Sequence, residues 1–142
     1  MHKKFAMLAT CQLNQWAMSF TQNKRNIIES IREAKRLGAT YRIGPELEIS
    51  GYGCEDHFFE LDTVRHSWQT LGEILKDHEL TKDILCDFGM PVHHKNTLYN
   101  CRVHCLNQKI ILIRPKMFLA GGNNYREARW FASWNKSAIE QF

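Results

Sequence analysis

The chain has 142 residues, of which 44% are hydrophobic and 24% are charged. This length is that of one domain, and the composition is that of a globular protein rather than a disordered one. Lysine and arginine number 19 against 15 aspartates and glutamates, and the resulting charge of +4 is spread along the chain. The charge gives weak support for an anionic partner such as a nucleotide, and we expect no binding to nucleic acid.

The chain contains five cysteines, an odd number at irregular spacing: Cys11, Cys54, Cys86, Cys101 and Cys105. No secretory signal precedes them, because the first fifteen residues are too polar and their apolar run is too short. No later stretch approaches a membrane span. We therefore expect a reducing compartment, the cytoplasm, and no membrane partner.

The beginning of the chain predicts a strand, a helix and a second strand. Residues 4–13 form a mostly apolar run, expected to be a strand that is buried on both faces. Apolar residues recur at helical spacing from Ile27 to Leu37, and Gly38 is a natural helix stop. Residues 39–44 predict the second strand, parallel to the first across the helix. Candidate N-caps of this helix are Ser19, Thr21 and Asn23.

The rest of the chain predicts a loop, a second helix and three further strands. Residues 45–58 have no clear period and follow a strand, at the edge where α/β sheets bind ligands. Apolar residues from Val64 to Leu75 predict an amphipathic helix. Three strands follow, the last two as an antiparallel hairpin: residues 83–92 with Pro91 at their end, 97–106 and 109–114. The tail is expected to be irregular with some helix.

Two ordered motifs carry a resemblance to a known family. Pro45-Glu46 ends the second strand and is followed by Gly51-Tyr52, and a later Tyr-Asn pair precedes a hairpin that leads to Lys116. In these features, from about residue 4 to about 134, the chain resembles the glutaminase domains of the carbon–nitrogen hydrolases, the nitrilase superfamily. The resemblance implies an α/β fold: residues 1–142 would form the N-terminal portion of a four-layer αββα sandwich.

The resemblance also implies a mechanism, in which a cysteine thiolate attacks the side-chain amide of glutamine and releases ammonia. Glu46 would be the general base that takes the thiol proton and then activates water. Lys116 would place a positive charge beside the developing oxyanion. Tyr52 and Tyr125 would line the glutamine pocket.

The nucleophile of that mechanism is the missing part. In the family it follows the lysine, whereas all five cysteines here precede Lys116, so we expect a chain truncated before it. Cys54 is the only cysteine near the expected site. We also expect these residues not to include the ATP-dependent synthetase domain that would use the ammonia, since no GxxxxGK[ST] or SGGxDS loop occurs among them. We expect no cofactor in this chain; ATP and Mg would belong to that domain.

Three interpretations stay open for the chain as a whole. It is the glutaminase portion of an enzyme, or a catalytically inactive short isoform that forms homo-oligomers or binds and regulates the full-length synthetase. Alternatively it has no stable role, because half a sandwich leaves a sheet face and strand edges uncovered.

Several other residues have a structural interpretation that we prefer. Cys101 and Cys105 would face away from His104 on a strand, so we expect no metal site. Glu48 is either a supporting partner of Glu46 or a polar loop residue. Three aromatic residues near two arginines resemble a base-stacking surface, but we expect them to pack in the core or at a subunit interface: Trp130, Phe131 and Trp134.

Overall fold

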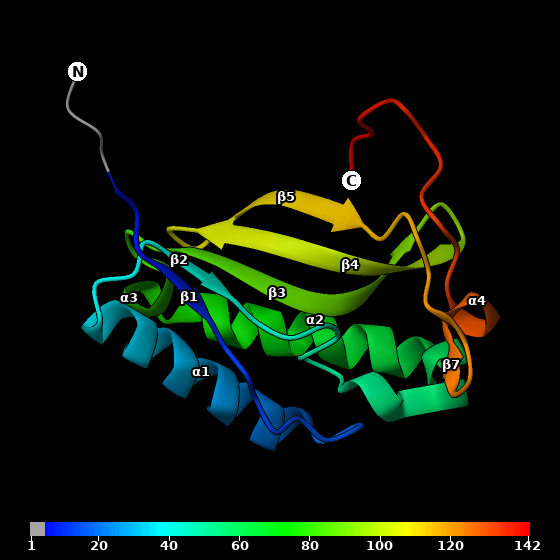
Figure 1. The fold of residues 1–142 in the computed structure, drawn as a ribbon, viewed down its shortest axis with the longest axis horizontal. Coiled ribbons are helices and arrows are strands. Elements are labelled where there is room, and N and C mark those ends of the chain that lie inside the picture. The colour runs from blue at the N-terminus through cyan, green and yellow to red at the C-terminus, as the bar shows by residue number, and fades with distance from the viewer. Residues whose placement is uncertain (1–4) are drawn as a thin grey trace.

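The computed structural model describes residues 5–142, which form a main sheet with helices on one side and a small two-stranded sheet (Figure 1). The main sheet has five strands in the order β1-β2-β3-β4-β5. The first three are parallel, and β3, β4 and β5 are antiparallel. Their bounds are Leu8–Thr10, Tyr41–Ile43, Leu85–His94, Thr97–Leu106 and Lys109–Pro115. The predicted α/β fold is confirmed: one helical layer on one sheet, which is half of the four-layer sandwich.

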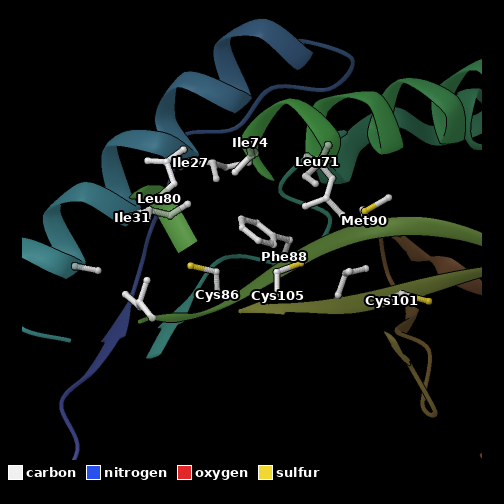
Figure 2. Close-up of a cluster of buried hydrophobic side chains, with 14 of the residues drawn as sticks. Ile27, Ile31, Leu71, Ile74, Leu80, Cys86, Phe88, Met90, Cys101 and Cys105 are labelled. Carbon is white, nitrogen blue, oxygen red and sulfur yellow. The ribbon is translucent and has the colours of Figure 1, made fainter. Parts of the chain in front are cut away.

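The helical layer consists of α1 (Phe20–Arg36), α2 (Leu61–Lys76) and the short α3 (His78–Thr81). The predicted apolar stripe of α1 is its buried face, where Ile27 and Ile31 are fully covered. Figure 2 shows these side chains packed with those of α2 over β3, around Phe88. Gly38 follows the helix with a φ of +78°, a conformation that favours glycine. The predicted end of the helix is therefore confirmed. The helix begins after Ser19, one of the three candidate N-caps, but the Ser19 side chain makes no capping hydrogen bond, and Thr21 and Asn23 lie inside the helix.

The first strand differs from its prediction. We expected residues 4–13 to be buried on both faces, but β1 has three residues, and Leu8 is 58% exposed. Lys4 lies outside the described residues. The prediction was wrong because β1 is an edge strand, and the helices cover only one face of this sheet. An apolar run thus does not by itself establish burial.

Pro91 does not end the third strand. β3 continues to His94, and Pro91 is paired with Asn100 of β4. A proline cannot donate to a strand neighbour, so it is excluded from central strands. It is tolerated here because β2 pairs with β3 only as far as Asp87. Beyond that residue β3 has a strand partner on one side only.

Two tight turns order the antiparallel part of the sheet. Lys95 and Asn96 join β3 to β4, and both have a positive φ, as the two-residue hairpin turn requires. Asn107 and Gln108 do the same between β4 and β5. The predicted hairpin of the last two strands is confirmed.

The loop and tail regions contain short elements. The segment after β2 includes a 3-10 element, η1 (Tyr52–Phe59), and the tail holds β6 (Gly121–Gly122), β7 (Tyr125–Arg126) and α4 (Glu127–Trp130). Phe131 is 4% exposed, and its ring centroid lies 4.8 Å from that of Phe58. Trp134 packs edge-on against Tyr99. The tail aromatics therefore pack against the domain, as the preferred interpretation predicts.

Large apolar side chains are exposed on the two edge strands. They are Leu8 on β1 and Ile110, Ile111 and Leu112 on β5. Within residues 5–142, no helix is both long and apolar enough to cross a membrane.

Candidate active site

Glu46 and Lys116, which are 70 residues apart in sequence, meet at the end of the parallel strands. Glu46 lies in the turn just after β2, and Lys116 follows β5 directly. Lys116 Nζ donates to Glu46 Oε1 at 2.6 Å. Both side chains are partly accessible, at 29% for Lys116 and 37% for Glu46. A substrate can therefore approach this carboxylate–ammonium pair.

Asn100 of β4 connects the two residues. Its side-chain amide donates to Glu46 Oε1 at 2.5 Å, and its backbone carbonyl accepts from the Lys116 N–H at 2.8 Å. The Tyr-Asn pair that served as a sequence marker thus supplies a direct contact to both charged residues.

A third charged residue, Glu127, completes the cluster and was not predicted. Its carboxylate is 1% exposed and accepts from Lys116 Nζ at 2.9 Å. It also accepts from the Ala120 N–H at 2.7 Å and from the Tyr52 hydroxyl at 2.7 Å. Burial alone would raise the pKa of Glu127, but these three donors outweigh it and hold the pKa below its usual range. Glu127 is thus a buried, ionised partner of Lys116.

The charge on Lys116 follows from the same contacts. Burial favours the neutral amine, but the hydrogen bonds to Glu127 and Glu46 raise the pKa of Lys116 above its ordinary value. The side chain is therefore an ammonium at neutral pH. An ammonium next to an accessible carboxylate is suited to stabilise negative charge that develops on a substrate oxygen.

Tyr52 and Tyr125 lie side by side at the rim of this cluster. Their rings meet edge to face with centroids 6.2 Å apart, and Tyr125 is 55% exposed. Burial, followed by the hydrogen bond to Glu127, raises the pKa of Tyr52, so its hydroxyl stays protonated. The structure therefore brings together all four residues named from the sequence.

The turn that carries Glu46 is packed tightly against β3. Gly89 is the reason: a Cβ atom there would lie 2.4 Å from the Leu47 nitrogen and 2.7 Å from the Pro45 carbonyl oxygen. Leu47 itself has a φ of +50°. The turn is thus held in a conformation that few sequences adopt.

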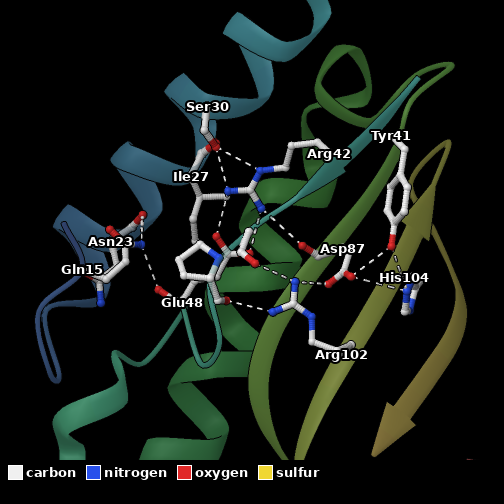
Figure 3. A network of polar contacts seen from close by, with 12 residues as sticks. Gln15, Asn23, Ile27, Ser30, Tyr41, Arg42, Glu48, Asp87, Arg102 and His104 are labelled. Atoms are coloured by element: carbon white, nitrogen blue, oxygen red, sulfur yellow. Dashed lines mark hydrogen bonds and ion pairs between the residues drawn. The ribbon is translucent and has the colours of Figure 1, made fainter. Parts of the chain in front are cut away.

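A buried ion pair fixes the far side of the same turn (Figure 3). Arg42 and Glu48 are both 0% exposed, and two parallel hydrogen bonds join them, at 2.7 and 2.8 Å. Ser30 of α1 accepts from the same guanidinium. Burial alone would lower the pKa of Arg42, but the Glu48 carboxylate raises it, so the guanidinium stays charged. Glu48 is therefore a supporting residue of the Glu46 turn, one of the two roles considered for it.

Four of the five cysteines are buried and do not offer a nucleophile to this cluster. Cys54 is 1% exposed, and its thiol donates to the backbone carbonyls of Ser50 and Gly51. Burial raises its pKa, which lowers the thiolate fraction. Burial also raises the pKa of the thiols of Cys86, Cys101 and Cys105 to about 12. Cys54 is thus packed as a small core residue.

Within residues 5–142 the cluster holds no metal-binding group, and a sizeable cavity lies elsewhere in the fold. Across residues 5–142, no group of three or more histidine, cysteine or acidic side chains could hold a metal ion. A cavity of about 500 Å³ lies instead between β5 and the C-terminal segment. Trp68, Tyr99 and Phe142 are among its lining residues.

The structure is a sheet covered by helices on one face, with an acid–lysine pair beyond the parallel strands. The carbon–nitrogen hydrolase family matches residues 7–140. The chain therefore belongs to this family. An amidase from Nesterenkonia sp. has the same fold, with a TM-score of 0.75 at 16% identity over 92% of this chain and 49% of the amidase chain.

Within the family, the chain is similar to glutamine-dependent NAD(+) synthetases. It is 64% identical to that of Dictyostelium discoideum over 136 residues, which are 96% of this chain and 19% of the relative. The crystal structure of such an enzyme from Cytophaga hutchinsonii has a TM-score of 0.89 and 30% identity, over 96% of this chain and 23% of that chain. The chain thus spans about a fifth of the length of the curated relatives it matches.

Proposed function

We propose that residues 1–142 form the first part of a glutaminase domain of the kind found in glutamine-dependent NAD(+) synthetases. The reaction is hydrolysis of the glutamine side-chain amide, and the ammonia serves ATP-dependent synthesis of NAD from deamido-NAD. The observation that carries the proposal is the 2.6 Å contact between Lys116 and the accessible carboxylate of Glu46. The similarity to the synthetases supports the choice of glutamine.

The residues of the cluster then have distinct roles. Glu46 accepts the proton of the attacking thiol and later activates water. The Lys116 ammonium, held in place by Glu127, stabilises the oxyanion of the tetrahedral intermediate. Tyr52 and Tyr125 form an aromatic wall of the glutamine pocket. The nucleophilic thiol is supplied by a cysteine outside these 142 residues, and ATP and Mg act in a synthetase domain that is also outside them.

A chimera tests this proposal. The matching 136 residues of the Dictyostelium enzyme are replaced by those of this chain, and ammonia release from glutamine is measured. We expect an active chimera, and we expect Glu46→Gln and Lys116→Met each to lower kcat by at least about 100-fold, the size of a missing acid–base or oxyanion interaction. Glu60→Gln, an exposed carboxylate in a pair with His57, is the matched control and should leave the rate unchanged. Full activity of the Glu46 variant would rule out the proposed base.

The chain by itself is expected to release no ammonia, because four of its five cysteines are buried and Cys11 lies at the end of β1, outside the Glu46–Lys116 contact. This leads to a second candidate function, an inactive partner of the complete synthetase. The exposed apolar side chains on β1 and β5 favour it, since such surfaces mark association sites. Co-purification of the tagged chain with full-length enzyme, abolished by Ile111→Lys, would support this candidate. If the chain alone released ammonia and Cys54→Ser removed that activity, two assignments would be contradicted: the nucleophile outside these residues and the inactive-partner function.

A further inference from the structure

Arg102 of β4 binds the backbone immediately before Glu46 (Figure 3). Its Nη1 donates to the Pro45 carbonyl at 2.9 Å, and its Nη2 donates to the Gly44 carbonyl at 2.8 Å. The guanidinium is three-quarters buried and also forms an ion pair with Asp87 of β3. A planar guanidinium can make these parallel contacts, whereas a single ammonium cannot.

The turn has few other anchors at this point. β2 ends at Ile43, and Pro45 has no N–H to donate. Among residues 5–142, Arg102 is the donor found for both carbonyls. The guanidinium reaches them beside Gly89, where a Cβ atom would lie 3.0 Å from Arg102 Nη1. The path of the chain into Glu46 thus depends on this side chain.

We propose that Arg102 is a positioning residue for Glu46, which sets the contact between the carboxylate and Lys116. Asn100, two residues earlier and on the same face of β4, binds the Glu46 carboxylate and the Lys116 backbone. Strand β4 therefore positions three things: the backbone that leads into Glu46, the Glu46 carboxylate and Lys116. The importance of Arg102 for catalysis rests on the proposed function, whereas its effect on the position of Glu46 does not.

Lys116 offers a direct readout, because it binds Glu46 and Glu127 at once. The ¹⁵N chemical shift of its ammonium is measured at neutral pH in the 142-residue chain, for the wild type, Glu46→Gln, Arg102→Gln and the double variant. We expect the Arg102→Gln signal to move to the position of Glu46→Gln, and the double variant to show no further shift. A crystal structure of Arg102→Gln should show Lys116 separated from Glu46 but still bound to Glu127.

Arg114→Gln is the matched control, since Arg114 is the exposed cross-strand neighbour of Arg102 and does not touch the turn. It should leave the Lys116 signal unchanged. If Arg102→Gln does not fold, Arg102→Lys decides. It keeps the charge beside Asp87 but lacks the planar fork that makes the two parallel contacts, so a partial shift is expected. A folded Arg102 variant with a wild-type Lys116 signal would overturn the proposal. No glutamine is used, so an inactive chimera would refute the function and leave this result standing.

Discussion

The buried Arg42–Glu48 pair provides a sharp test of how the Glu46 turn is held. Glu48→Gln removes the negative charge and keeps the shape of the side chain. The guanidinium of Arg42 is 0% exposed, so it cannot reach water in the folded state. One of the two parallel hydrogen bonds would also become a contact between two donors, because the new amide group cannot accept there.

The expected loss of unfolding free energy is about 3–5 kcal/mol, the cost of leaving a buried charge without its partner. This is a large part of the roughly 5–15 kcal/mol that stabilises a domain. Replacing both residues by methionine removes the charges together, and an unbranched side chain suits the narrow space beside Gly44, where a Cβ atom would lie 2.1 Å from the Glu48 carboxylate. Arg42→Met/Glu48→Met should therefore be clearly more stable than Glu48→Gln alone.

Urea unfolding at pH 7, followed by the fluorescence of the four tryptophans, measures these differences. Glu33→Gln is the control, because it breaks the exposed pair with Arg36 and should have a much smaller effect. A loss below about 1 kcal/mol for Glu48→Gln, the size of one ordinary hydrogen bond, would refute the reasoning. So would a double variant that is as unstable as the single one.

Three further predictions concern other parts of the chain. Glu127→Gln should lower the unfolding free energy by about 2 kcal/mol at pH 7, as the loss of hydrogen bonds to a charged group does. Because the pKa of Glu127 is depressed in the folded state, its contribution to stability is present above the ordinary glutamate pKa of about 4.3 and is lost as the pH falls below that value. Urea unfolding at pH 3.5 should therefore show a smaller difference between the variant and the wild type. Glu55 has φ +48° and ψ −129°, so Glu55→Gly should raise the unfolding free energy by about 1 kcal/mol, and Glu55→Ala should not. A thiol reagent should modify Cys11 rapidly in the native chain and the four buried cysteines only after unfolding; rapid modification of Cys54 would contradict its assignment to the core.

The fold could be predicted from the sequence where local signals agree with packing. The stripe from Ile27 to Leu37 is such a case, since helical spacing and Gly38 both indicate one helix, and the core confirms it. The errors occurred where the neighbours of an element decide its environment. β1 is exposed because of its edge position, and Pro91 is accepted because β2 is short. Neither fact is visible in the residues themselves.

The site was predicted in part, for a related reason. Glu46, Lys116, Tyr52 and Tyr125 were found by resemblance, and the structure places them together. Glu127 was missed because, in the sequence, a glutamate in a short polar segment cannot be told from an ordinary solvent-exposed glutamate. Arg42 and Arg102 could have been noticed in the sequence, because each is an arginine within a predicted strand. Arginine is rarely buried in a strand unless it is paired, so each predicts a buried partner. Their partners could not be named, because Glu48 and the carbonyls of the turn are met only in three dimensions.

Under the proposed function Glu46 has to accept a proton while it binds an ammonium, and the second carboxylate, Glu127, accounts for how it could do so. With Lys116 as its only neighbour, Glu46 would be half of a neutral pair, and a proton taken from a thiol would leave a positive charge behind. Glu127 changes this balance, because it is buried and its pKa is depressed, so it keeps its own negative charge. Two carboxylates and one ammonium carry one net negative charge, and uptake of one proton makes the cluster neutral. Glu46 is the more accessible of the two carboxylates, so it is the one that a substrate can reach.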